Sequence, residues 1–195
     1  MAPPERSPWG VFLATALFTG LREGELLGLR WEHTHLQAAP PFLAVRHGWY
    51  REIGFIEPKT DESVRDVPLP LTAWTALHTW RERGRQRWTR RRSVTSAAER
   101  VFPLAAQSYR DPMRRVIRAA RLTLEPKLHQ LRHQYASAMA ARDVPAKVLQ
   151  TWMGHSDIGM SLNYYAKGMD SAPVVEKFLG GFGERKVLRK VGVPQ

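Results

Sequence analysis

Residues 42–69 differ in pattern from the sequence on both sides of them, and this contrast constrains the fold more than any other feature. The segments FLAVRHGWYREIGFIEPKT and SVRDVPL are rich in β-branched and aromatic residues, and Gly48, Gly54, Pro58 and Pro68 interrupt them. Short strands joined by tight turns have this composition. We therefore expect a small antiparallel sheet in this part of the chain.

The sequence on either side of this segment is typical of helices. Apolar residues recur there at helical spacing, and proline or glycine stands near several of the expected ends, as Pro145 and Gly154 do. The expected helical stretches are 9–18, 20–31, 69–83, 111–122, 131–143 and 144–154. The fold class predicted is α+β, mainly helical, with a minor antiparallel sheet.

The bulk composition excludes several classes of protein. The chain has 195 residues, enough for one good-sized domain or two small ones. It contains no cysteine, which excludes a disulfide scaffold, a thiol nucleophile and a thiolate metal site, and which suits a reducing, intracellular setting. The most apolar N-terminal stretch, residues 9–18, is too short to span a bilayer.

The charge of the chain points to a polyanionic partner. Lysine and arginine number 30 against 18 acidic residues, a net charge of +12, and such an excess favours binding to nucleic acid. Four arginines fall at i, i+4, i+8 and i+11 of one expected helix, namely Arg110, Arg114, Arg118 and Arg121. We expect this stripe to contact DNA phosphates, and a merely solvated basic face is the alternative.

Two adjacent tyrosines end the stretch SDIGMSLNYY and cannot share one role, because neighbours on a helix point about 100° apart. Ile158, Leu162 and Tyr165 stand at i, i+4 and i+7, and we expect them to form the apolar stripe that faces the core. Tyr164 then points out of the core or into a cleft. An isolated exposed tyrosine would be ordinary surface, but other reactive side chains accompany this one.

These side chains occupy turns and helix starts along the whole chain. His129 and Arg132 lie three residues apart on one helix, and His155 directly follows Gly154. Taken singly, each has an ordinary structural explanation, such as a capping histidine or a solvated lysine in a turn. The remaining members of the set are Arg22, Glu25 and Lys59.

As a set, these residues resemble one known pattern. Four motifs occur in a fixed order along the chain. They are TGLREGELLGLRW, then PKT with SVRDVPL shortly after it, then HQLRHQYAS, and finally MGHSDIGMSLNYY. Together they resemble the catalytic domain of tyrosine recombinases, the phage integrase family. The resemblance extends over about residues 19–179 and implies the DNA breaking-rejoining fold, in which a tyrosine cleaves and rejoins DNA through a covalent 3′-phosphotyrosine.

The resemblance also implies a role for each residue. Arg22 and Arg132 would bind the scissile phosphate, with Glu25 supporting Arg22, and Lys59 would protonate the leaving 5′ oxygen. The remaining catalytic positions would be His129, His155 and the nucleophile Tyr164. Guanidinium groups suit the phosphate oxygens because they bind them in a planar, bidentate manner. We expect the nearby arginine charges to lower the pKa of Tyr164 and a neutral His129 to accept its proton.

No cofactor or metal is expected, because the phosphotyrosine conserves the energy of the broken bond. His129 and His133 form the single helical histidine pair, and Arg132 beside them would repel a cation. The expected partners are double-stranded DNA and further copies of the chain, assembled as a tetramer, and no membrane. The expected location is cytoplasmic and associated with the nucleoid. Two other readings stay open: a DNA-binding fragment that does not cut, and a relaxing topoisomerase of the same mechanistic class.

The resemblance finally predicts how the chain is divided. Residues 1–180 would form the catalytic domain, and residues 181–195 a basic, flexible tail. Full-length members carry an N-terminal helical domain that closes around the duplex, and only about eight residues precede the first expected helix here. We therefore expect this chain by itself to bind DNA weakly and in a salt-sensitive way.

Overall fold

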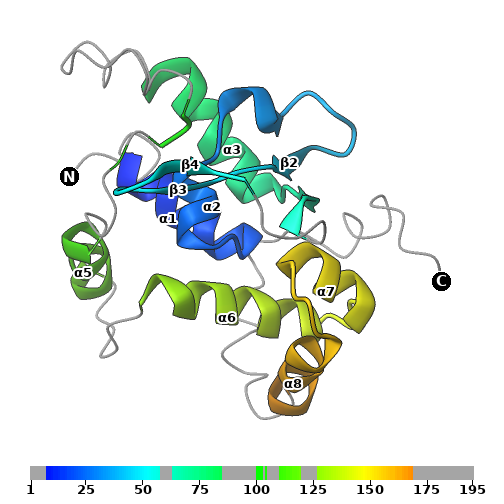
Figure 1. Cartoon of the computed structure of the whole chain (residues 1–195). Helices are drawn as coiled ribbons and strands as arrows, with labels where there is room; N and C mark the ends of the chain where they lie inside the picture. The colour runs from blue at the N-terminus through cyan, green and yellow to red at the C-terminus, as the bar shows by residue number, and fades with distance from the viewer. Residues whose placement is uncertain are drawn as a thin grey trace.

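The computed structural model describes residues 8–57, 63–84, 100–102, 104, 110–119 and 127–168. Helices dominate this part of the chain, in agreement with the predicted fold class (Figure 1). The α-helices are α1 (Pro8–Thr19), α2 (Glu23–Leu27), α3 (Leu71–Thr79), α5 (Arg110–Ala119), α6 (Leu128–Ala140), α7 (Ala146–Met153) and α8 (Ile158–Gly168). A short 3₁₀ turn, η2 (Trp31–His33), follows α2, and a π-helical turn, η4 (Trp80–Gly84), continues α3.

The predicted antiparallel sheet is present, divided into two small sheets. One has the strand order β1 (Thr34–His35), β2 (Phe42–Val45), β5 (Arg65–Pro68), and all its pairings are antiparallel. The other is a hairpin of β3 (Gly48–Tyr50) and β4 (Gly54–Ile56). Strand β5 alternates strictly, with the side chains of Arg65 and Val67 buried and that of Asp66 exposed. This alternation directs Arg65 into the interior.

Helix α1 lies at the centre of the domain and packs against both α3 and α6. Val11, Phe12 and Ala16 on α1 are almost completely buried, and the Phe12 ring meets Phe102 edge to face. Figure 1 shows α6 running below α1 and α2, with α7 and α8 at its C-terminal end. Arg132 of α6 links the C-terminal ends of α1 and α7, because it donates to the carbonyls of Gly20 and Met153. Among the described residues, no helix combines the length and the apolar character needed to cross a membrane.

Helix α8 packs on α6 and α7, but not through the predicted face. Ser161 is fully buried, whereas Ile158 and Leu162 are 40% and 50% exposed. The prediction that Ile158, Leu162 and Tyr165 form a core stripe is therefore wrong. Tyr164 and Tyr165 are both half-buried and both contact the core. The small Ser161 permits close approach of α8 to its neighbours, and its hydroxyl contacts His155, which explains why a polar residue occupies the buried position.

Candidate active site

The turn at Gly20 places the first arginine of the site. Gly20 ends α1 with a φ of 65°, in the left-handed region that favours glycine. A Cβ on this residue would lie 2.4 Å from the Tyr135 ring, so the close packing of α6 also requires glycine. The chain leaves this turn through Leu21 and reaches Arg22, at the start of α2. The Gly20 carbonyl accepts a hydrogen bond of 2.7 Å from Nη1 of Arg132.

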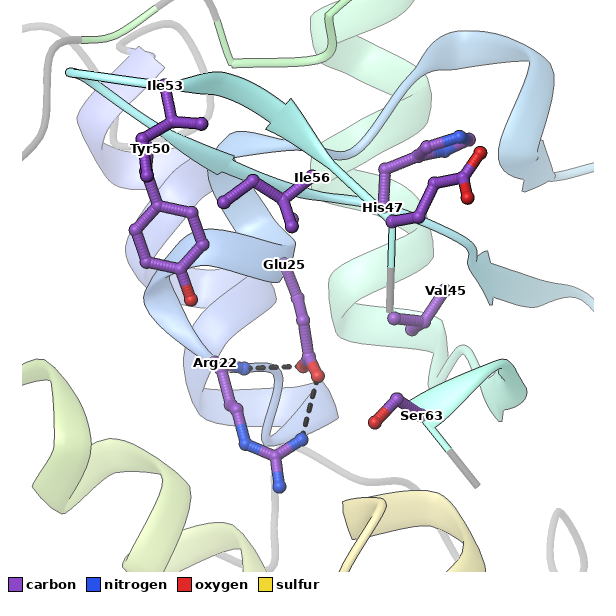
Figure 2. Close-up of a pocket in the computed structure, with 10 residues that line it drawn as sticks. Arg22, Glu25, Val45, His47, Tyr50, Ile53, Ile56 and Ser63 are labelled. Carbon is purple, nitrogen blue, oxygen red and sulfur yellow. Dashed lines mark hydrogen bonds and ion pairs between the residues drawn. The ribbon is translucent and has the colours of Figure 1, made fainter. Parts of the chain in front are cut away.

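Glu25 holds Arg22 in place from one turn further along α2. The backbone N–H of Arg22 donates to Oε2 of Glu25 at 2.8 Å, and Nη1 of Arg22 donates to Oε1 at 2.8 Å. Figure 2 shows both contacts below the β3–β4 hairpin, from which Tyr50 points toward them. The Arg22 side chain is 43% exposed. It is thus fixed on one side and accessible on the other.

Arg65 is a member of the site that the sequence analysis did not single out. Its side chain is only 2% exposed, and its Nη1 and Nη2 donate to Oε1 and Oε2 of Glu25, both at 2.9 Å. Burial by itself raises the pKa of Glu25, but the hydrogen bonds and charge of Arg65, together with Arg22, lower that pKa to about 2. Glu25 is therefore a carboxylate at neutral pH, shared between two arginines. The alternation of Arg65 with the apolar Val67 was the available signal.

The C-terminal end of α7 gathers three arginines. Helix ends leave carbonyl groups without partners inside the helix, and here the carbonyls of residues 152, 153 and 154 accept from Arg65, Arg132 and Arg22 in turn. The bond from Arg65 Nε is 2.8 Å long and that from Arg22 Nη2 is 2.7 Å. Partial negative charge at a helix C-terminus favours such cations. This single helix end therefore positions both predicted phosphate-binding arginines.

Gly154 is required for this arrangement. It caps α7 with a φ of 61°, and a Cβ there would lie 2.8 Å from Nη1 of Arg65. Glycine both permits the left-handed turn and leaves room for the guanidinium.

A cleft of about 650 Å³ opens beside these arginines, lined by Arg22, His129 and Arg132 among others. Arg132 is 4% exposed, and burial together with the Arg22 charge lowers its pKa to about 9. It therefore keeps its charge at neutral pH. The opposite wall is the β3–β4 hairpin with Trp49 and Tyr50. Two guanidiniums at one cleft suit an anion such as phosphate.

His155 lies directly after the α7 cap, as predicted, and is 4% exposed. Its Nδ1 is 3.0 Å from Oγ of Ser161, and its ring stacks on that of Tyr164 at 6.3 Å between centroids. Burial, and then the charges of Arg132 and Arg22, lower its pKa to about 4. The imidazole is therefore neutral at pH 7 and can donate only one hydrogen bond from its ring.

The hydroxyl of Tyr164 meets a histidine, but not the predicted one. Nδ1 of His133 lies 2.6 Å from this hydroxyl, and Nε2 of His133 lies 2.7 Å from Nε2 of His129. His133 thus stands between Tyr164 and His129. Burial raises the pKa of Tyr164 more than the Arg132 charge lowers it, so the expectation that arginine charges would lower this pKa overall is wrong for the free protein.

The two adjacent tyrosines differ in what their hydroxyl groups contact. The Tyr165 hydroxyl donates to the backbone carbonyl of Val144, which ties α8 to the start of α7. The Tyr164 hydroxyl instead faces His133. The predicted core stripe separated the two tyrosines on a wrong packing face, and the resemblance to the family independently gave Tyr164 as the nucleophile. In the structure, the partners of the two hydroxyl groups distinguish the residues directly.

Several predicted residues have no described environment. Lys59 and Arg121 lie outside the described residues, as do residues 169–195 with the predicted tail. Arg110 and Arg114 are exposed on α5, and Arg114 pairs with Asp111 at 3.1 Å. Within the described part of the chain, no three histidine or acidic side chains are grouped as a metal ion would need.

Comparison with known proteins identifies the family of this chain. The sequence model of the phage integrase family matches residues 8–171. The chain belongs to the phage integrase family. Similar curated relatives are a XerC-like tyrosine recombinase of Caldanaerobacter subterraneus subsp. tengcongensis, 28% identical over 77% of this chain and 43% of the relative, and the transposase of transposon Tn916 from Enterococcus faecalis, 31% identical over 80% and 42%.

Solved structures of integrases share the fold. The Tn1549 transposon integrase in complex with circular intermediate DNA is 26% identical, with a TM-score of 0.62 over 87% of this chain and 59% of that one. The XerA recombinase is 18% identical with a TM-score of 0.61 over 81% and 51%, which supports the fold alone. The chain spans less than half the length of the curated relatives it matches.

Proposed function

We propose that this domain is the catalytic part of a site-specific DNA recombinase that cleaves and rejoins strands through a 3′-phosphotyrosine on Tyr164. The observation that carries the proposal is the convergence at the end of α7. Two guanidiniums bind carbonyls there, the neutral His155 follows directly, and the ring of Tyr164 stacks on that histidine. Family membership supplies the reaction class.

Arg22 and Arg132 would bind the non-bridging oxygens of the scissile phosphate. Among the described residues, each guanidinium uses two N–H groups for protein oxygens, and a guanidinium has five. The N–H groups left over can bind the phosphate as its charge grows in the transition state. Donors that are fixed before the reaction stabilise that charge without reorganising. Glu25 and Arg65 hold the Arg22 side of this arrangement in place.

Tyr164 would attack phosphorus, which breaks the bond to the 5′ oxygen. A phenol with an ordinary pKa near 10 costs about 4 kcal/mol to ionise at pH 7, so the proton must be accepted as the attack proceeds. We assign protonation of the leaving 5′ oxygen to Lys59, by resemblance to the family. His155 would donate a hydrogen bond to the phosphate. Attack of a second 5′ hydroxyl on the phosphotyrosine would complete strand exchange without ATP or metal.

The substrate we propose is double-stranded DNA. A net charge of +12 favours this polyanion, and the exposed Arg110 and Arg114 on α5 would contact its backbone. Exchange between two duplexes needs four strand cleavages, so we propose that four copies assemble on the DNA. We propose that the protein acts in the cytoplasm, at the nucleoid, because its DNA substrate would lie there.

The experiment is capture of the covalent intermediate. A pool of nicked duplexes with randomised sequence, whose short 5′ fragment diffuses away after cleavage, would be incubated with the protein and run on a denaturing gel. We expect a protein–DNA adduct with the wild type and none with Tyr164→Phe. If both proteins bind the duplexes and neither forms an adduct, even with an N-terminal DNA-binding domain attached, the domain binds DNA without cutting it.

A further inference from the structure

We propose that His133 is the catalytic base that takes the proton of Tyr164, and that it passes the proton to His129, which releases it to water. The inference rests on the proposed function and adds a residue and a proton path to it. Its basis is a continuous chain of close contacts. The Tyr164 hydroxyl lies 2.6 Å from Nδ1 of His133, and the opposite ring nitrogen of His133 lies 2.7 Å from Nε2 of His129.

The two contacts depend on each other, because a neutral imidazole has one N–H and one bare nitrogen. If His133 donates from Nε2 to His129, its Nδ1 is left to accept from the Tyr164 O–H. The reverse arrangement would make His129 the donor and direct an N–H of His133 at the phenol oxygen. A phenol O–H is the stronger donor and an imidazole nitrogen the stronger acceptor, which favours the first arrangement.

In the first arrangement the proton transfer balances. The Tyr164 O–H bond breaks and its proton goes to Nδ1 of His133, while the phenol oxygen forms a bond to phosphorus. The bond from phosphorus to the 5′ oxygen breaks, and that oxygen takes a proton from Lys59 in the proposed mechanism. His133 then releases its Nε2 proton to His129. The helix makes this path possible because the two histidines are four residues apart on α6.

The surroundings of the two histidines suit this task. Both imidazoles are exposed, so water can take up the proton from His129. Among the described residues, the titratable groups near His133 include Arg132 beside it on α6 and His155 from the α7–α8 turn. His155 is a poor base, since its pKa is about 4, and its ring nitrogen Nδ1 lies at Ser161 rather than at the phenol. Burial raises the pKa of Tyr164, which increases the need for a base in contact with it.

Chemical rescue tests the assignment. The pool of nicked duplexes would be cleaved by the wild type, His133→Ala and His129→Ala, with the rate of adduct formation measured. Loss of a general base slows a reaction by about 100-fold or more, and we expect this for His133→Ala and a smaller decrease for His129→Ala. Added imidazoles should restore His133→Ala, and the restored rate should rise with their basicity. An effect of His133 on structure alone would not follow basicity. A His133→Ala rate equal to that of the wild type, or a larger loss in His129→Ala, would overturn the proposal.

A second measurement needs no DNA and separates this inference from the proposed function. Nitrogen chemical shifts in the uniformly ¹⁵N-labelled protein report which ring nitrogen of each histidine carries the proton. We expect Nδ1 of His133 to be bare and its resonance to shift in Tyr164→Phe. A proton on Nδ1 of His133 would refute the relay, whether or not an adduct forms. If the wild type forms no adduct, the proposed function fails, and the shifts still decide the direction of the hydrogen bond.

Discussion

Replacement of Glu25 by glutamine should change the pH dependence of stability in a way that follows from the buried arginine pair. Glu25 accepts two hydrogen bonds from Arg65 and one from the Arg22 side chain, and its side chain is 11% exposed. Glu25→Gln keeps the shape and removes the charge. Arg65 would then be left as a buried cation without its carboxylate. Breaking such a pair costs about 3–5 kcal/mol, and we expect a loss of this size at pH 7.

The size of the pH effect follows from the pKa of Glu25, which folding lowers from 4.5 to about 2. One pKa unit corresponds to about 1.4 kcal/mol, so the ionised carboxylate contributes about 3 kcal/mol to stability. This contribution is complete above pH 4.5 and is lost as the pH falls toward 2. At pH 3 about 2 kcal/mol of it is gone. Glu25→Gln cannot lose this contribution, because it has no carboxylate at this position.

The assay is urea unfolding of both proteins at pH 7 and pH 3, followed by tryptophan fluorescence. We expect the difference in unfolding free energy between wild type and Glu25→Gln to narrow by about 2 kcal/mol from pH 7 to pH 3. Glu52→Gln, on the exposed turn of the hairpin, is the control and should change stability at pH 7 by less than about 0.5 kcal/mol. A difference that stays constant, or widens, would show that Glu25 is not ionised by its arginine partners.

Two further substitutions test other parts of the site. Gly154→Ala places a Cβ 2.8 Å from Arg65 at a φ of 61°, whereas Gly54→Ala has a φ of 84° and nothing within 4 Å. Thermal unfolding should show that both variants lose about 1–3 kcal/mol of stability, with the larger loss in Gly154→Ala. Gly154→Ala should also form the adduct more slowly. Equal effects of the two substitutions would contradict a role for the Arg65 contact. Tyr165→Phe removes the hydroxyl bound to the Val144 carbonyl and should cost about 1 kcal/mol while adduct formation continues at the wild-type rate. Loss of the adduct in Tyr165→Phe would mean that the wrong tyrosine has been assigned.

The sequence predicted the succession of helices around a small antiparallel sheet because periodicity and proline or glycine positions are local signals. It also predicted that Arg22, Glu25 and Arg132 belong together, through the resemblance to a family. The structure shows how these arginines are held together: they donate hydrogen bonds to the carbonyl groups at the C-terminal end of α7. One of these contacts, from Arg22 to the carbonyl of Gly154, joins residues that are 132 positions apart in the sequence. No local pattern can predict a contact of that kind.

The errors have identifiable physical causes. Apolar residues at helical spacing predict Ile158 and Leu162 in the core, yet α8 packs through the small Ser161, because side-chain size limits how closely the helices approach. A charged residue in a strand is normally solvated, so the alternation of Arg65 with Val67 is the one sequence feature that indicates burial of this arginine. His133 was visible as a partner of His129 at i+4. Its contact with Tyr164 depends on how α8 packs on α6, which the sequence pattern did not predict.

The most direct test of the account is to identify the residue that carries DNA in the trapped adduct. The adduct would be digested with nuclease and protease, and the peptide that spans residues 164 and 165 would be sequenced by tandem mass spectrometry. The account predicts a nucleotide on Tyr164, with Tyr165 unmodified. A nucleotide on Tyr165, or on a residue outside this pair, would contradict the assignment of the nucleophile and the active site built around it.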